Sequence, residues 1–202
     1  MSAQRADKII AISETTKRDL LTYLEVDESK VEVIYHGIDI KTPLKLEKVK
    51  DLPSSYLFFV GDRSGYKNFY LMLNAFAALS KKHPDLHLVL SGGGNLVGAE
   101  IEIITRLKLQ DSVHHYNVTD EQLNYLYSHA LLFVYPSLYE GFGLPLLEAM
   151  NMECPVICSD IGSFSEIVND AAIYFDPTDM ESISFKMEKL IFDDQNNIKP
   201  FV

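Results

Sequence analysis

The residues Tyr139–Met150 have the sequence YEGFGLPLLEAM and follow an apolar run, LLFVYPS, over residues 131–137. The apolar run predicts a buried strand. Proline at position 145 predicts a short helix that begins at Leu144 or Pro145, because the first helical position does not need the N–H group that proline lacks. The free N–H groups of that first turn would face the carboxyl end of the sheet, where an anion such as a diphosphate is favoured.

Two glutamates bracket this turn with seven residues between them. Glu140 precedes the glycines of the turn, and Glu148 lies about one turn into the predicted helix. Both carboxylates could point to one side of the same crevice and accept hydrogen bonds from hydroxyl groups. The two glycines between them let the backbone approach a ligand closely and take positive φ angles. Taken singly, a solvated surface role is the default for Glu140, and a glutamate inside a helix is ordinary.

From residue 54 onward, short apolar runs alternate with helical patterns. This order predicts right-handed crossovers and an α/β, Rossmann-like parallel sheet with helices on both faces. Apolar runs without polar alternation are typical of strands that are buried on both sides. The predicted strands cover residues 56–60, 86–91, 113–116, 131–135, 155–158 and 172–175. The predicted helices cover residues 68–79, 95–107, 120–129, 144 onward, 163–168 and 178–192.

A second, smaller unit precedes this sheet. Residues 7–12 and 31–35 predict two strands, and Ser13 predicts the N-cap of a helix that ends near Leu24. The sequence KTPLKLEKVKDLP at residues 41–53 mixes charge and proline and predicts a linker. We therefore expect three parts: residues 1–40, a linker over residues 41–53, and a domain over residues 54–202.

The composition narrows the function classes. Hydrophobic residues make up 47% of the chain, which excludes a disordered protein. The net charge of −11 argues against a nucleic-acid partner, which needs a basic face. No apolar run approaches the roughly 20 residues that span a bilayer, and the first ten residues lack a secretory pattern. Cys154 and Cys158 predict buried structural thiols in a reducing compartment, so we expect a cytoplasmic protein without a metal site.

The loop after residues 56–60 carries the basic residues of interest. Its sequence, GDRSGYKN at residues 61–68, places Arg63 and Lys67 four positions apart, before a helix that Asn68 could cap. Ligands of an open parallel sheet lie beyond the carboxyl ends of the strands. Two cations there could neutralise a diphosphate, Arg63 through a forked contact and Lys67 as a point charge. The alternative is a pair of solvated loop cations.

The loops after the next two strands carry weaker signals. Three glycines at residues 92–94 resemble a phosphate cradle, but a tight turn is the favoured interpretation because no complete nucleotide-binding glycine motif is present. Asn117 and Val118 could flank a flat base, and a plain connection is an equal alternative. Among the histidines, only His36 is a candidate for a place near a site, because it follows a strand at the predicted boundary.

Several segments together resemble the carboxyl-terminal half of GT-B-fold retaining glycosyltransferases, the group called glycosyltransferase family four or glycosyl transferases group 1. These segments are VGDRSGYKNFYLMLNAF, PSLYEGFGLPLLEAMNMECPVICSD and SFSEIVNDAAIYFDPTD. ADKIIAISETTKRDL and VEVIYHGID resemble the end of that family's amino-terminal domain and its hinge. The resemblance implies a domain that binds a UDP- or GDP-linked sugar and takes part in hexose transfer with retention of configuration. It implies no metal and no other cofactor.

The resemblance also implies a role for each site residue. Arg63 and Lys67 would bind the diphosphate, and Glu140 would contact hydroxyls of the transferred sugar. Glu148 would accept hydrogen bonds from the ribose, and the loop after residues 113–116 would lie near the base. The implied catalytic residues are Arg63, Lys67 and Glu140. The implied donor-binding residues are Gly61, Asn117, Val118, Gly141, Phe142, Gly143, Leu144 and Glu148.

The chain departs from the family pattern in two respects. Asp62 stands beside Arg63, which could weaken the attraction for phosphate. Only a short remnant of the amino-terminal domain is present, so we expect a truncated donor-binding half that is inactive alone and lacks its acceptor domain. Peripheral membrane contact would then occur only through the missing half. The alternative is a non-catalytic interaction module that docks with a separate amino-terminal domain. A nucleotide-sugar epimerase of the same fold is a third interpretation, for which no acid/base residues can be identified.

Overall fold

The computed structural model describes residues 2–38, 45–63 and 65–193. Residues 39–44, which include the start of the predicted linker, and residues 194–202 of the predicted domain lie outside the described residues.

Six parallel strands form one sheet, in the order β5-β4-β3-β6-β7-β8. The predicted Rossmann-like parallel sheet is therefore confirmed, and the observed strand ends differ from the predicted ends by no more than one residue. The strands are β3 (Tyr56–Val60), β4 (His87–Ser91), β5 (Val113–Tyr116), β6 (Leu132–Tyr135), β7 (Val156–Ser159) and β8 (Ile173–Phe175).

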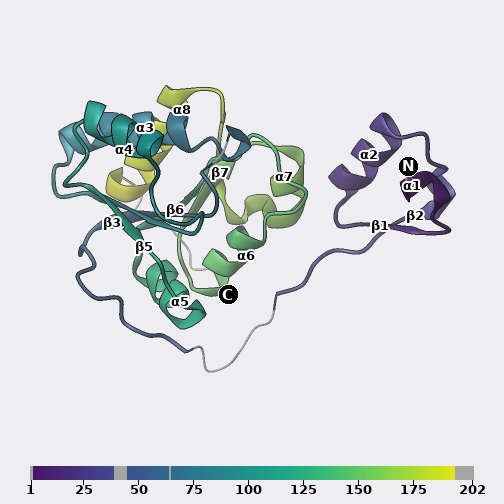
Figure 1. Ribbon diagram of the computed structural model, residues 1–202, viewed down its shortest axis with the longest axis horizontal. Helices are drawn as coiled ribbons and strands as arrows, with labels where there is room; N and C mark the ends of the chain where they lie inside the picture. Colours follow the sequence, from purple (N-terminus) through teal and green to yellow (C-terminus); the bar gives the residue numbers. More distant parts are fainter. Residues whose placement is uncertain (1, 39–44, 64, 194–202) are drawn as a thin grey trace.

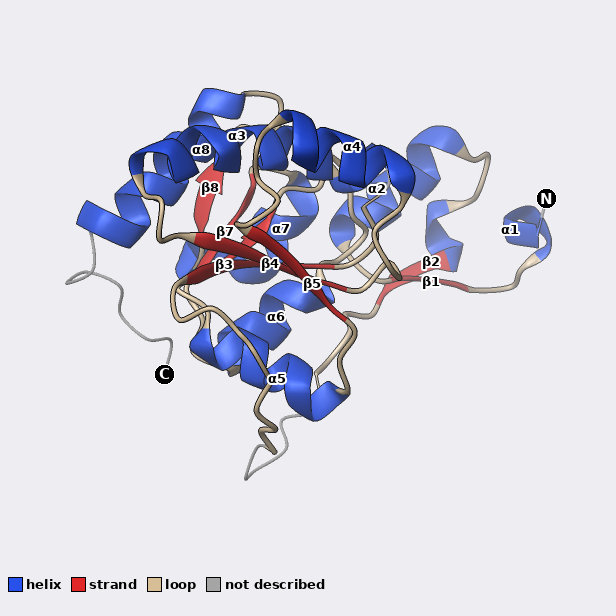
Figure 2. Cartoon of the chain, turned by 60° about the vertical axis from the view of Figure 1, so that its left-hand side comes forward, coloured by secondary structure: helices blue, strands red, loops and turns tan. Residues whose placement is uncertain are grey.

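Helices cover both faces of this sheet (Figure 2). One face packs against α3 (Phe69–Lys82), α4 (Gly98–Arg106) and α8 (Met180–Glu188), and the last of these continues as a π-helical turn, Lys189–Asp193. The other face packs against α5 (Asp120–His129), α6 (Leu144–Asn151) and α7 (Gly162–Val168), which is followed by a 3-10 turn, Asn169–Ala171. A sheet buried on both faces explains why its strands are apolar throughout.

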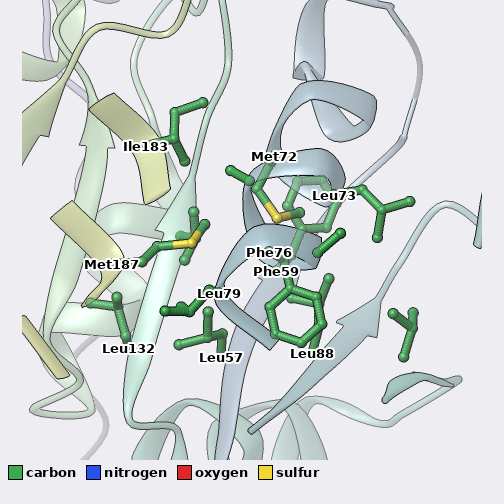
Figure 3. Close-up of a cluster of buried hydrophobic side chains, with 14 of the residues drawn as sticks. Leu57, Phe59, Met72, Leu73, Phe76, Leu79, Leu88, Leu132, Ile183 and Met187 are labelled. Atoms are coloured by element: carbon green, nitrogen blue, oxygen red, sulfur yellow. The ribbon is translucent and has the colours of Figure 1, made fainter. Parts of the chain in front are cut away.

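Large apolar side chains fill the space between the sheet and the first helical layer. Figure 3 shows Leu57 and Phe59 of β3 near Phe76 of α3 and Met187 of α8, and all four are fully buried. Burying each such side chain contributes roughly 1.5–3 kcal/mol relative to leaving it exposed. This packing fixes β3, and with it the loop that follows β3.

The order of the strands reverses between β3 and β6. From β3 the chain moves outward through β4 to β5, and it then returns to β6 on the other side of β3. The segment after β3 leads to α3 on one face, and the segment after β6 leads to α6 on the opposite face. Ligands of open α/β sheets bind at such a switch point, between the two diverging loops.

The first residues form a small separate layer, drawn in purple at one side of Figure 1. Helix α1 (Ser2–Arg5) is followed by a pair of parallel strands, β1 (Ile9–Ala11) and β2 (Val31–Val33), with α2 (Glu14–Tyr23) and a 3-10 turn (Glu28–Lys30) between them. Ser13 caps α2 by accepting a hydrogen bond from the N–H group of Thr16, as predicted. The unit contacts the main domain through α2 and α7.

One local prediction needs correction. Asn68 does not cap α3, because its backbone is left-handed (φ 57°) and its side chain donates instead to the carbonyl of Pro177, at 2.7 Å. The described part of the predicted linker packs along α5. The side chain of Val49 is buried there, and the N–H group of Glu47 donates to the carbonyl of Glu121 at 3.1 Å.

The thiols of Cys154 and Cys158 are both free and buried, as predicted. Burial raises the pKa of the Cys154 thiol to about 12. It also raises the pKa of the Cys158 thiol. Neither thiol therefore forms a reactive thiolate at neutral pH.

Candidate functional site

Lys67 and Glu140 meet at the switch point between β3 and β6. The Nζ atom of Lys67 lies 2.6 Å from Oε1 of Glu140, and the two side chains are only 13% and 15% exposed. Lys67 ends the short turn Gly65–Lys67 after β3, and Glu140 lies in the loop after β6. The two loops are joined by a backbone hydrogen bond from the N–H group of Leu138 to the carbonyl of Tyr66, at 2.8 Å. The structure thus brings one basic and one acidic residue of the predicted site into direct contact.

Two hydroxyl groups form hydrogen bonds with this ion pair. Oε1 of Glu140 also accepts hydrogen bonds from the hydroxyls of Tyr135, at 3.0 Å, and Ser137, at 2.8 Å. The Tyr135 hydroxyl in turn accepts from Nζ of Lys67, at 3.1 Å. Burial, and then the charge of Glu140, raises the pKa of Tyr135, so its hydroxyl stays protonated and remains a donor at neutral pH. These bonds hold one oxygen of Glu140 and orient the carboxylate toward the loop after β3.

Helix α6 begins at Leu144, shortly after Glu140 in the chain, as predicted. Gly143 precedes it with φ 109°, and a Cβ atom there would lie 2.9 Å from a ring carbon of Phe164. Only glycine therefore allows the chain to turn into the helix this close to α7. Pro145 lies in the first turn, where its lack of an N–H group costs no hydrogen bond.

Glu148 lies on α6 and is half-buried. Its Oε2 atom accepts a hydrogen bond from the hydroxyl of Tyr127 on α5, at 3.1 Å. Burial, followed by the charge of Glu148, raises the pKa of Tyr127. Among the described residues, no hydrogen bond joins Glu148 to Glu140, so the two predicted carboxylates have separate partners.

Arg63 does not join the Lys67–Glu140 pair. Its side chain is 2% exposed and forms an ion pair with Glu100 of α4, with 2.8 Å between Nε and Oε1. The Nη1 and Nη2 atoms donate to backbone carbonyls of the turn after β4. The three glycines of that turn have φ angles of 80°, 66° and 71°, a left-handed backbone that glycine adopts without strain.

Asn117 follows β5 and is exposed, and Val118 packs partly against the apolar core. The Nδ2 atom of Asn117 donates to Oδ1 of Asn95, at 2.8 Å. Asn95 was not among the predicted site residues. Its place directly after the three glycines, at the carboxyl end of a strand, is the signal that could have identified it.

The amino-terminal unit rests on the loop between Glu140 and α6. The hydroxyls of Ser13 and Thr16 donate to the carbonyl of Gly141, at 2.6 and 3.2 Å. The ring of His36 lies edge-on to that of Phe142, with 5.3 Å between centroids. The sequence singled out His36 but not the two hydroxyls, whose partner is 125 or more positions away.

Within the part of the chain that the structure describes, no three His, Cys, Asp or Glu side chains are grouped so that they could hold a metal ion. In that same part, every helix is too short or too polar to cross a membrane.

Comparison with known proteins gives two family matches. Residues 42–199 match the family model described as Glycosyl transferases group 1. Residues 1–42 match the model described as Glycosyltransferase Family 4.

Two curated relatives are both named as O-antigen chain mannosyltransferases. The O-antigen chain mannosyltransferase RfbU of Salmonella typhimurium is 32% identical over 185 residues, which cover 90% of this chain and 50% of that protein. The O-antigen chain mannosyltransferase B of Escherichia coli is 36% identical over 158 residues, which cover 74% of this chain and 40% of that protein. The chain thus spans half or less of the length of these relatives.

Solved structures match almost the whole chain. Anabaena Alr3699/HepE in complex with UDP-glucose superposes with a TM-score of 0.81 at 20% identity, covering 97% of this chain and 57% of that one. A glycosyltransferase from Rickettsia africae superposes with a TM-score of 0.75 at 24% identity, covering 93% of this chain and 54% of that one. At these identities the likeness shows that the fold is shared.

Proposed function

Because this chain belongs to the glycosyl transferases group 1 family, we propose that it binds a nucleotide sugar at the switch point of its sheet and presents the sugar for transfer. The observation that carries the proposal is the contact between Lys67 and Glu140 at the start of α6. A cation, a carboxylate and a helix amino terminus lie together there, and these groups suit a diphosphate that carries a polyol.

In this proposal Lys67 and the backbone N–H groups of Phe142, Gly143 and Leu144 bind the diphosphate. The bond between the anomeric carbon and the diphosphate oxygen breaks during transfer, and the electron pair leaves with the diphosphate. Fixed positive charge near that oxygen stabilises the charge that develops in the transition state. Lys67 and the α6 amino terminus supply this charge without a metal ion or other cofactor.

Glu140 would accept hydrogen bonds from hydroxyls of the transferred sugar, and Glu148 would do the same for the ribose. Asn117 and Val118 would lie near the base, while Gly61 and Gly141 would give the backbone room to approach the donor. The acceptor hydroxyl would form its bond to the anomeric carbon on the face that the diphosphate leaves, so that configuration is retained, and would release its proton.

The curated relatives support a hexose donor, and their names support mannose as the sugar. The nucleotide would be UDP or GDP. We further propose that the acceptor is bound by polypeptide outside these 202 residues, so that this chain alone transfers no sugar. The greater length of the relatives supports this division.

Ligand-observed NMR tests the proposal with UDP, GDP, ADP and their hexose-linked forms. We expect saturation transfer from the protein to base and ribose protons of at least one nucleotide. A folded sample that transfers saturation to none of them at millimolar concentration would refute the proposed donor site.

A further inference from the structure

Arg63 makes its hydrogen bonds inside the protein. Nε donates to Oε1 of Glu100 at 2.8 Å, and Nη1 donates to the carbonyl of Gly92 at 2.6 Å. Nη2 lies within hydrogen-bond distance of three carbonyls, at 3.3, 2.8 and 3.2 Å from those of Gly93, Gly94 and Asn95. A guanidinium has five N–H groups, so these contacts use most of its donors. A diphosphate could bind Arg63 only if the residue first released this turn.

The turn after β4 is shaped around this side chain. Residues 92–94 have left-handed backbones, and a Cβ atom on Gly93 would lie 2.9 Å from Nη1 of Arg63 and 3.0 Å from the carbonyl of Gly61. Glu100 holds the other side of the arrangement, because its Oε2 atom accepts from the N–H group of Val97 at 2.8 Å. Several carbonyl groups of the turn thus accept hydrogen bonds from the buried guanidinium of Arg63. Without that cation these carbonyls would lose their hydrogen-bond partner.

The end of the turn carries an exposed amide pair. Oδ1 of Asn95 accepts from Nδ2 of Asn117 at 2.8 Å, and both residues are exposed beyond the carboxyl ends of neighbouring strands, β4 and β5. Beyond this bond, the Asn117 amide keeps an acceptor and a second donor hydrogen, and the Asn95 amide keeps its Nδ2 donors. Asparagine amides pair with the polar edges of nucleobases in this way.

We propose that Arg63 is a positioning residue, which orders the turn Gly92–Asn95 so that Asn95 and Asn117 together recognise the base of the nucleotide. This inference rests on the proposed function and assigns Asn95 as a further specificity-determining residue. It gives Arg63 a role different from the diphosphate contact that the family resemblance implies. Lys67 remains the side-chain cation that meets the diphosphate.

The number of phosphates on the ligand distinguishes the two roles of Arg63. Calorimetry would compare the nucleoside monophosphate and diphosphate of the base that the wild-type chain binds. We expect Arg63→Lys to weaken both ligands by the same factor of about tenfold, the effect of losing one well-formed polar contact. Lys67→Ala should weaken the diphosphate more than the monophosphate. If Arg63→Lys also weakens the diphosphate more than the monophosphate, the positioning role is overturned.

Arg63 is buried, so its substitution could disturb the fold, whereas Asn95 is exposed. A second variant at Asn95 therefore tests the proposal without this complication. Asn95→Ala should leave the fold intact, weaken both ligands equally, and reduce discrimination between bases. Unchanged affinities in Asn95→Ala would overturn the base-recognition role.

The ligand-free protein provides a separate readout. The side-chain amide signals of Asn95 and Asn117 should shift in Arg63→Lys and stay in place in Lys67→Ala, and unshifted signals in Arg63→Lys would overturn the positioning role. If the wild-type chain binds no nucleotide, the proposed function and the base recognition both fail, whereas these amide signals still decide whether Arg63 positions the turn.

Discussion

Lys67 and Glu140 form an ion pair of 2.6 Å although 73 positions separate them in the chain. The second ion pair at this edge of the sheet, between Arg63 and Glu100, is 2.8 Å long and almost completely buried. A fully buried ion pair does not exchange partners while the protein is folded, because separating its charges leaves one of them unpaired. The Lys67–Glu140 pair is more accessible. In the proposed function a ligand would offer each member a new partner: phosphate oxygens for Lys67 and sugar hydroxyls for Glu140.

The variant Glu140→Gln tests the proposed phosphate contact of Lys67 and the proposed sugar contact of Glu140 separately. The amide keeps the shape of the side chain but no longer neutralises Lys67, so the free nucleoside diphosphate should bind a few-fold more tightly, as expected for ~0.5–1 kcal/mol from a partly exposed pair. The same change should weaken the contact with sugar hydroxyls. Calorimetry with the nucleoside diphosphate and its hexose-linked form measures the ratio of the two affinities. An unchanged ratio would show that Glu140 does not meet the sugar.

Glu148→Ala tests the ribose contact. We expect the ribonucleotide to lose about 1.5–3 kcal/mol of binding free energy, the usual value for a hydrogen bond to a charged group. A 2′,3′-dideoxy analogue has no ribose hydroxyls at these positions, so its binding free energy should change little in Glu148→Ala. Tyr127→Phe is the matched control, since it removes the partner of Glu148 at 3.1 Å and leaves the carboxylate in place. Equal losses for both nucleotides would place Glu148 outside the ribose site.

Glu166 of α7 holds the amino-terminal unit in place. Its two oxygens accept from the N–H groups of Glu14 and Thr15, at 2.6 and 3.0 Å, so it caps α2 from another helix. Glu166→Gln should loosen α2 by about 1 kcal/mol, as the loss of a helix cap does. Faster hydrogen exchange in α2, with unchanged exchange in the strands of the main sheet, is the expected result. Glu102→Gln, at an exposed position on α4, is the control.

The same contact should depend on pH. Partial burial pushes the pKa of the Glu166 carboxyl upward, but hydrogen bonds from Glu14, Thr15 and Tyr35 outweigh this and hold the pKa below its usual value. A lowered pKa in the folded state means that the stabilisation is present above the unfolded-state pKa, about 4.3, and is lost as the pH falls through the folded-state pKa. The amide signals of Glu14 and Thr15 should therefore shift below about pH 4.3 in the wild type and not in Glu166→Gln.

Local patterns predicted most of the fold. The apolar runs at β3 and β5 matched the observed strands at both ends, and Ser13 caps its helix as its position before Glu14 suggests. These features depend on residues close in sequence, so periodicity and capping chemistry can identify them. The predicted cap at Asn68 was wrong for the opposite reason. The Asn68 side chain donates to the carbonyl of Pro177, 109 positions away, and no local pattern contains that contact.

The same distinction explains the site. Lys67 and Glu140 were placed together because each follows a strand at the carboxyl edge of one parallel sheet, and strand order alone brings such loops together. The direction in which Arg63 points could not be predicted in this way. Asp62 and Arg63 are adjacent, and only the packing of the turn Gly92–Asn95 against Gly61 shows that the guanidinium points inward. The contacts of Ser13 and Thr16 with Gly141 likewise depend on how two units dock.

Titration calorimetry of the wild-type chain and Lys67→Ala with UDP, GDP and their hexose-linked forms tests the proposed donor site most directly. We predict saturable binding of one nucleotide series to the wild-type chain. In Lys67→Ala that affinity should fall about 10- to 100-fold, the loss of one charge-assisted contact of ~1.5–3 kcal/mol, while circular dichroism stays unchanged. Lys82→Ala, which removes an exposed ion pair with Glu188 on the outer helices, should bind as the wild type does. Equal affinities in the wild type and Lys67→Ala, or no binding to either, would contradict a donor site built on Lys67 and Glu140.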